Sequence, residues 1–146
     1  NWVGGNRLLK LVVRPGFTVR ERIDGTPGGR IGRAMDGREY PMHDFTAIIG
    51  DDISIAIVSL DVYGLDVQND GTVRLTLLRS PYYAHHDPFS VPQVHDFPVT
   101  DQGIHEYEIS VLLMSTFDLD RVCAEVTRKE RPLVISETTR GMPSRV

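Results

Sequence analysis

Three of the five histidines lie in one short stretch of the chain, together with two aspartates, as His85-His86-Asp87 and His95-Asp96. Imidazole and carboxylate groups are good zinc ligands, but a tetrahedral site needs three or four of them converging on one ion. Adjacent residues of an extended chain point to opposite faces, so His85 and His86 are poorly placed to share an ion. The chain has no His-x-x-x-His or Cys-x-x-Cys spacing. We therefore interpret this stretch as a polar, proline-rich loop, predict no metal site, and keep a metal-dependent enzyme as a third hypothesis.

Paired carboxylates are the other chemistry to consider, because retaining glycoside hydrolysis needs two of them about 5 Å apart. The chain offers seven acidic candidates, which are Asp61, Asp66, Asp87, Asp96, Asp101, Glu106 and Glu108. No spacing singles out a pair among them, and the chain has no Gly-x-Ser-x-Gly motif of a serine hydrolase. The residues therefore predict no catalytic site in this chain.

Two residues are candidates for contact with a ligand. Tyr63 follows the strongest strand signal of the chain, and its ring could stack on the face of a sugar. Arg79 ends a predicted strand before Ser80-Pro81, where its guanidinium could reach a hydroxyl or carboxylate at the edge of a sheet. The alternative is structural: Tyr63 packs at the rim of a sheet and Arg79 pairs with a local acid.

The elements that would position these residues are mostly strands. Alternating apolar and polar residues, broken by Gly, Pro, Asn and Asp, predict strands at residues 7–13, 17–23, 40–49, 53–60, 62–68, 72–78, 107–113 and 133–135. We expect the first two to form a hairpin through Pro15-Gly16, and residues 24–29 to form a loop. Apolar residues at i, i+3, i+4 and i+7 predict one helix, from Leu119 to the residues before Pro132, with Cys123 in its buried stripe. This pattern indicates an all-β protein, an antiparallel β-sandwich with one short helix near the C-terminus.

Length and composition place the chain among ordinary globular domains. The 146 residues suit a single domain over residues 1–146. A net charge of −4, with no basic block, argues against a nucleic-acid partner, and no apolar run approaches the ~20 residues of a membrane span. Asn1 stands where an initiator Met would, which fits an excised segment, and no signal-peptide pattern follows it. The lone Cys123 allows no internal disulfide, so we expect a cytoplasmic location.

Several short motifs occur in an order that resembles a known family. They are Leu8-Leu9-Lys10-Leu11, Glu39-Tyr40-Pro41, Tyr63-Gly64-Leu65-Asp66, Leu77-Leu78-Arg79-Ser80-Pro81, the set Asp101, Gly103, His105 and Tyr107, and Arg131-Pro132-Leu133 after the predicted helix. Together they resemble the C-terminal β-domain of the zinc-dependent α-mannosidases of glycoside hydrolase family 38. One segment departs from the family: Ser59-Leu60-Asp61-Val62 stands where members often have Asn-Asp-Ser-Lys.

The resemblance implies a segment of a galactose-mutarotase-like super-sandwich that carries no catalytic residue, metal ligand or cofactor of its own. Its parent would hydrolyse terminal α-mannosides with retention, with zinc and both catalytic carboxylates in another domain of the same polypeptide. The implied partners are that catalytic domain and the mannoside substrate. Tyr63 and Arg79 would lie nearest the substrate, Asp101, Gly103 and His105 would be structural, and this chain alone would be inactive. The alternative is a stand-alone carbohydrate-binding β-sandwich module.

Overall fold

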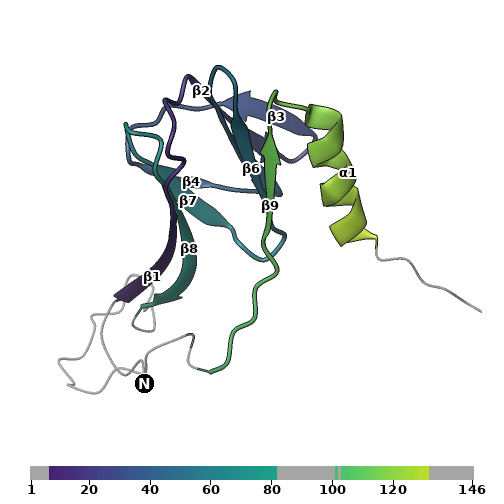
Figure 1. Ribbon diagram of the computed structural model, residues 1–146. Coiled ribbons are helices and arrows are strands. Elements are labelled where there is room, and N and C mark those ends of the chain that lie inside the picture. The colour runs from purple at the N-terminus through teal and green to yellow at the C-terminus, as the bar shows by residue number, and fades with distance from the viewer. Residues whose placement is uncertain (1–6, 82–100, 102, 132–146) are drawn as a thin grey trace, which may run out of the picture.

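A computed structural model describes residues 7–81, 101 and 103–131 of the chain, and Figure 1 shows how their elements are arranged. Those elements are, in chain order, β1 (Arg7–Val13), β2 (Glu21–Thr26), β3 (Gly29–Gly32), β4 (Glu39–Pro41), β5 (Phe45–Ile49), β6 (Ser54–Val58), β7 (Gly64–Val67), β8 (Val73–Ser80), β9 (Ser110–Met114) and α1 (Leu119–Glu130). Every strand pair is antiparallel. The predicted fold class, an antiparallel sandwich with one short helix, is confirmed.

The strands form two sheets that enclose the main core. Sheet A has four strands in the order β1-β8-β7-β4, and sheet B has five in the order β3-β2-β5-β6-β9. Buried side chains from both sheets and their connections fill the space between them: Met42, Ile48, Ile57, Val62, Leu65, Val67, Val73 and Leu75. Each fully buried aliphatic side chain of this kind contributes about 1.5–3 kcal/mol of transfer free energy, so this layer holds the two sheets together.

Helix α1 covers the other face of sheet B, on the side away from sheet A (Figure 1). Val122 and Val126 are buried against Ala47 and Ala56, whose small side chains let the helix approach closely. The helix begins at an N-cap, Asp118, whose carboxylate accepts a hydrogen bond of 3.1 Å from the Arg121 backbone N–H. No helix of the described residues is long and apolar enough to cross a membrane.

The predicted helix is therefore confirmed, but the prediction that Cys123 is a core residue is wrong. Its side chain is exposed, whereas Val122 beside it is completely buried. The apolar stripe of the sequence is wider than the face that contacts sheet B: Val122 and Val126 are buried in the cluster beneath the helix and Leu119 packs against it, but Cys123 does not. Residue 123 consequently lies at the margin of the contact.

Polar contacts tie the helix to the strand beneath it. Glu125 accepts a hydrogen bond of 2.5 Å from the Ser110 hydroxyl of β9 and two from Arg128. These bonds, those from Arg128 first, lower the pKa of the Glu125 carboxyl to about 2. Lys129 Nζ lies 2.7 Å from Glu108 Oε1, just before β9. Helix α1 and β9 therefore form one unit along the length of the helix.

The predicted hairpin at residues 7–23 is wrong. Strand β1 pairs with β8 in sheet A, with Leu11 opposite Leu75, whereas β2 belongs to sheet B and pairs with β3 and β5. Residues 14–20 cross from one sheet to the other instead of turning back. Pro15-Gly16 resembles a hairpin turn locally, but all seven residues of β1 find partners along β8, and the chain then crosses to sheet B.

Two further segments differ from the sequence expectation. The single strand predicted at residues 40–49 is two strands, β4 in sheet A and β5 in sheet B, separated by residues 42–44. The loop predicted at residues 24–29 is mostly strand, because β2 continues to Thr26 and β3 starts at Gly29. Strand β9 begins at Ser110, three residues later than expected, and the predicted strand at 133–135 lies outside the described residues.

A charged cluster is buried at the end of the core where β4 faces β2. Arg22 and Asp24 have completely buried side chains and form a two-fold ion pair, with Nε 2.9 Å from Oδ1 and Nη2 2.6 Å from Oδ2. The Thr46 hydroxyl donates to Asp24 Oδ1 over 2.7 Å, and Arg33 Nε lies 3.1 Å from Oδ2 without hydrogen-bond alignment. The Tyr40 ring of β4 stacks on both guanidinium groups, at 5.3 Å and 4.9 Å. This end of the sandwich is therefore closed by ionic and aromatic contacts.

Candidate functional site at the end of sheet A

Two motifs that are far apart in the sequence meet at the end of β8. The register between β1 and β8 shifts at Leu9/Lys10, so that Leu77 has no partner residue on β1. Such a bulge frees main-chain groups from the ladder. The Tyr107 hydroxyl donates a short hydrogen bond to the Leu77 carbonyl, and its ring packs against the main core. Tyr107 thereby fixes the extended segment before β9 to the end of sheet A.

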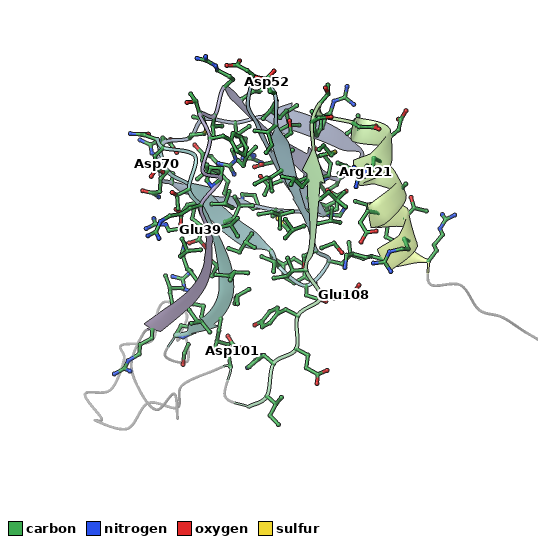
Figure 2. The ribbon with its side chains drawn as sticks, in the orientation of Figure 1. Glu39, Asp52, Asp70, Asp101, Glu108 and Arg121 are labelled. Carbon is green, nitrogen blue, oxygen red and sulfur yellow. The ribbon has the colours of Figure 1, made fainter. Side chains whose placement is uncertain are left out.

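The residues just before Tyr107 form a compact turn at the same end of the molecule, where Figure 2 shows Asp101. Asp101 and Gly103 both adopt positive φ angles, 58° and 138°. His105 Nε2 lies 3.1 Å from the Asp101 carbonyl oxygen, which requires the proton on Nε2, and the imidazole stacks on the Tyr107 ring at 6.4 Å. His105 thus contacts both Asp101 and Tyr107, whereas Gly103 contributes only its backbone conformation.

A second cluster of motif residues lies on the outer face of sheet A. The side chain of Asp66 is almost completely buried and accepts three hydrogen bonds of 2.6 Å, from Lys10, Gln68 and Arg74. Lys10 also donates to Glu39 Oε2 over 2.9 Å. Strands β1, β4, β7 and β8 each contribute at least one of these groups. The Leu-Leu-Lys, Glu-x-Pro and Tyr-Gly-x-Asp motifs thus meet in one ionic network across the sheet.

This network also positions the turn that carries Tyr63. The Glu39 carboxylate lies so close to Gly64 that a Cβ atom there would sit 2.9 Å from Glu39 Oε1. The Met42 backbone N–H donates to the Tyr63 carbonyl over 3.0 Å. Glycine at position 64 therefore lets Glu39 pack against the turn, while the Tyr63 side chain stays 74% exposed.

The network around Asp66 predicts that the stability of the fold depends on pH in the acid range. Burial alone raises the pKa of Asp66, but the hydrogen bonds from Arg74, Lys10 and Gln68 outweigh it and leave the pKa below its ordinary value. A depressed carboxyl pKa stabilises the fold above the unfolded value of about 3.9, and this stabilisation is lost as the pH falls through the folded-state pKa. We expect Asp66→Asn to be less stable than the wild type at pH 6, with the difference shrinking below about pH 4. Urea unfolding followed by circular dichroism between pH 2.5 and 6 measures this. The control is Asp52→Asn, at an exposed turn position (Figure 2), and an equal pH profile in both variants would contradict the prediction.

Tyr63 and Arg79, the two predicted ligand contacts, are both on the surface of sheet A. Tyr63 directly precedes β7, and Arg79 lies in β8 opposite Leu8 of β1. Arg79 is exposed and forms no ion pair with any acid of the described residues. No hydrogen bond joins the two side chains, so the structure places them on one sheet without bringing them into contact.

The remaining candidates do not form a reactive group. Among the described residues, no three His, Cys, Asp or Glu side chains gather closely enough to hold a metal ion. His85, His86 and His95, with Asp87 and Asp96, lie outside the described residues. Of the acidic candidates, Asp61 accepts a hydrogen bond of 2.8 Å from the Glu108 backbone N–H, and Glu108 contacts the helix. Asp61 and Glu108 therefore have structural partners, and the two carboxylates that do approach each other, Asp66 and Glu39, are bridged by Lys10.

Reasoning from single residues missed Lys10, Arg74 and Tyr107 as parts of this site. Lys10 and Arg74 lie in strands of alternating polar and apolar residues, where a charged residue normally faces the solvent. Arg74 has no signal except the strand register, which places it opposite Asp66. Lys10 and Tyr107 could be found only through the motifs that contain them.

Comparison with known proteins gave one match. The model described as the glycosyl hydrolases family 38 C-terminal domain matches residues 1–92, which contain β1 to β8 and therefore all of sheet A and most of sheet B. The search of curated proteins found no match, and neither did the search of solved structures. Strand β9, helix α1 and the turn at Asp101 lie beyond the matched stretch.

Proposed function

This chain belongs to glycosyl hydrolase family 38, as part of the C-terminal domain of a glycosidase, and from that membership we propose that it is a non-catalytic β-domain of a retaining α-mannosidase. In this proposal the parent enzyme removes terminal α-linked mannose. The chain supplies a rigid surface that packs against the catalytic domain and helps to complete its sugar pocket. The family match over residues 1–92 carries the proposal.

The geometry at the end of sheet A supports a docking role. The turn at Asp101 and the end of β8 are locked together through Tyr107, so they present one fixed surface. Ile104 in this turn is 96% exposed, and Arg79 on β8 has no charged partner among the described residues. Tyr63, which precedes β7 of the same sheet, is 74% exposed. Exposed aromatic, aliphatic and arginine side chains on a rigid frame are typical of surfaces that another domain covers.

The chemistry of bond cleavage is assigned to another domain of the parent. The part of this chain that the structure describes contains no cluster that fits a metal ion. In the proposed parent, zinc and the catalytic carboxylates lie in the catalytic domain. The proposed role of this chain is to form one wall of the sugar pocket. There Arg79 donates hydrogen bonds to a substrate hydroxyl or to a carboxylate of the catalytic domain.

The test is to measure aryl α-mannoside hydrolysis by the parent enzyme and by this chain alone, both with zinc present. We expect turnover by the parent and none by the chain. In the parent, Arg79→Ala should raise KM or lower kcat/KM about tenfold, because a charge-assisted hydrogen bond contributes about 1.5–3 kcal/mol. The control is Arg38→Ala, whose guanidinium is exposed and pairs with the nearby Asp36.

Three results would contradict the proposal in different ways. Turnover by the isolated chain would show that it carries its own catalytic groups. A parent that cleaves another glycoside but no α-mannoside would remove the proposed specificity. Titration calorimetry with mannose and mannobiose addresses the binding-module alternative, since heat of binding by the isolated chain would favour that reading over a scaffold.

A further inference from the structure

A groove lies between helix α1 and the end of sheet B that carries β2 and β3 (Figure 1). Its volume is about 370 Å³, which is within the range of small-molecule sites. Three segments far apart in the sequence form its walls: the turn from β2 into β3, the connection from β4 to β5, and one flank of α1. None of the residues that line it belongs to the motifs at the end of sheet A, so the groove is a separate site.

The floor of the groove is apolar and its surroundings are polar. Phe45 and Val126 are buried in the cluster beneath the helix, and Leu119 packs against the same cluster. Polar side chains line the groove around this floor, among them Arg30, His43, Asp44, Thr127 and Glu130. An apolar surface with a small number of polar groups beside it is the usual composition of a site for a small ligand.

The Asp44 carboxylate is held in a fixed position at this groove. Its Oδ1 accepts a hydrogen bond of 2.8 Å from the Phe45 backbone N–H, and its main-chain carbonyl accepts one of 2.9 Å from the Ser59 N–H. A Cβ atom at Gly25 would overlap Asp44 Oδ1, so glycine at that position leaves the room that the carboxylate occupies. The carboxylate is therefore oriented before any ligand binds.

The charge of Asp44 is not compensated by the residues that the structure describes. No described Lys or Arg side chain pairs with it, or with Glu130 on the helix side of the groove. Burial raises the pKa of the Asp44 carboxyl and the negative charge of Glu130 adds to the rise, while the hydrogen bond from Phe45 and the charge of His43 oppose it. A cation in the groove would supply the missing positive neighbour.

The arrangement of the donor groups indicates what kind of cation fits. Within the described part of the chain, no three His, Cys, Asp or Glu side chains gather closely enough to hold a metal ion. The apolar floor is also of no use to a bare ion, whereas it would bury the carbon atoms of an organic one. A cation with an apolar body uses both the floor and the carboxylate.

We infer that this groove binds a small organic cation, a primary ammonium group on an apolar body. The ammonium group donates a hydrogen bond to Asp44 and is attracted by Glu130, while the apolar body rests on Phe45 and Leu119. Arg30 does not block the site, because it lies on the exposed strand β3 and its long side chain can turn toward solvent. The inference is independent of the proposed function, since it uses no residue of sheet A.

Titration of the ¹⁵N-labelled 146-residue chain with benzylammonium, followed by NMR, tests the inference. We expect saturable shifts of the amide signals of Phe45 and Val126 at millimolar concentration. Benzyl alcohol, which is similar in size but uncharged, should bind about tenfold more weakly, because a hydrogen bond between charged groups is lost. Asp44→Asn keeps the shape of the side chain and removes its charge, so it should weaken benzylammonium binding by about the same factor.

A second variant blocks the groove without touching the carboxylate. Cys123 is exposed and lines the groove, so Cys123→Trp should fill the space and abolish binding. Its matched control is Ala124→Trp, at the next exposed position of the helix, which does not line the groove. The control for charge is Asp52→Asn, in the exposed turn before β6. Both controls should bind benzylammonium as the wild type does.

Three results would overturn the inference. The first is the absence of saturable shifts in the wild-type chain. The second is binding of benzyl alcohol or benzoate as tight as that of benzylammonium, because Asp44 would then not select a cation. The third is binding that survives Cys123→Trp, which would place the ligand elsewhere. If Asp44→Asn does not fold, the comparison of the three ligands still decides whether charge is recognised.

Discussion

Replacing Asp24 by alanine is expected to destabilise the fold by about 3–5 kcal/mol, because it leaves the buried Arg22 guanidinium without its counter-ion. The Arg22 guanidinium is completely buried and donates two of its hydrogen bonds to Asp24, at 2.9 Å and 2.6 Å. Its remaining described partners are the Ala34 carbonyl, at 3.1 Å, and the face of the Tyr40 ring. Neither neutralises the charge. The measurement is the free energy of unfolding in urea, followed by circular dichroism.

A double variant separates the effect of the unpaired Arg22 charge from the effect of the lost side-chain packing. Arg22→Met with Asp24→Leu removes both charges and keeps most of the volume, so it should be much closer to the wild type than Asp24→Ala. Thr46→Val removes only one neutral donor to Asp24 and should cost about 1 kcal/mol. If the double variant were as unstable as Asp24→Ala, the defect would lie in side-chain shape, and the electrostatic explanation would be wrong.

Replacing Gly71 by alanine should also be costly, by about 2–4 kcal/mol, because strain and collision act together. Gly71 closes the turn between β7 and β8, where its backbone N–H donates to the Gln68 carbonyl over 2.8 Å. Its φ of 81° is one that side chains of L-residues rarely adopt. A Cβ atom there would also lie 2.2 Å from Val19 Cγ2, so the connection between the sheets would have to move.

Gly16→Ala is the matched control for that experiment. Gly16 has a similar φ of 72°, but a Cβ atom there meets no other atom within 4 Å. It should therefore show the cost of strain alone, about 1–2 kcal/mol. Chemical denaturation of both variants gives the difference that belongs to the collision with Val19. Equal losses in the two variants would show that Val19 moves aside freely.

Local patterns predicted the elements whose contacts are local or repeat regularly. The alternation at residues 53–60 became β6, and the apolar stripe after Asp118 became α1. Residues 69–71, whose sequence Asn-Asp-Gly is typical of a hairpin turn, connect the predicted strands that became β7 and β8. Each of these depends on periodicity or turn chemistry within about a dozen residues, which the sequence displays directly.

The errors share a different cause, which is that partners were assigned by proximity in sequence. Residues 7–13 and 17–23 alternate correctly, but nothing within them says that the first strand pairs with β8 and the second with β5. The sequence predicts Asp24 to be a loop residue, because aspartate near glycine and proline is typical of loops. In the folded chain it is buried by Arg22 and Thr46, two and twenty-two residues away.

The motifs could name candidate residues but not their contacts. They name Arg79, Asp101, Gly103 and His105 as candidates, and the family match over residues 1–92 covers only the first of these. They could not show that Tyr107 reaches the Leu77 carbonyl, since that bond depends on a bulge created by a third strand, β1. Likewise, the ionic network of Asp66 needs four strands aligned side by side before its members meet.

The pairing of β1 with β8 has a consequence for the chain during its synthesis. Arg7 finds its partner only in Ser80, seventy-three positions later. At about 5–20 residues per second, ribosomes need roughly 4–15 s to make that stretch. During this interval Leu8, Leu9, Leu11 and Val12 have no sheet to join, and they are an attractive target for holding chaperones. Although β1 is synthesised before the other strands described here, it can join sheet A only after β8 has been made.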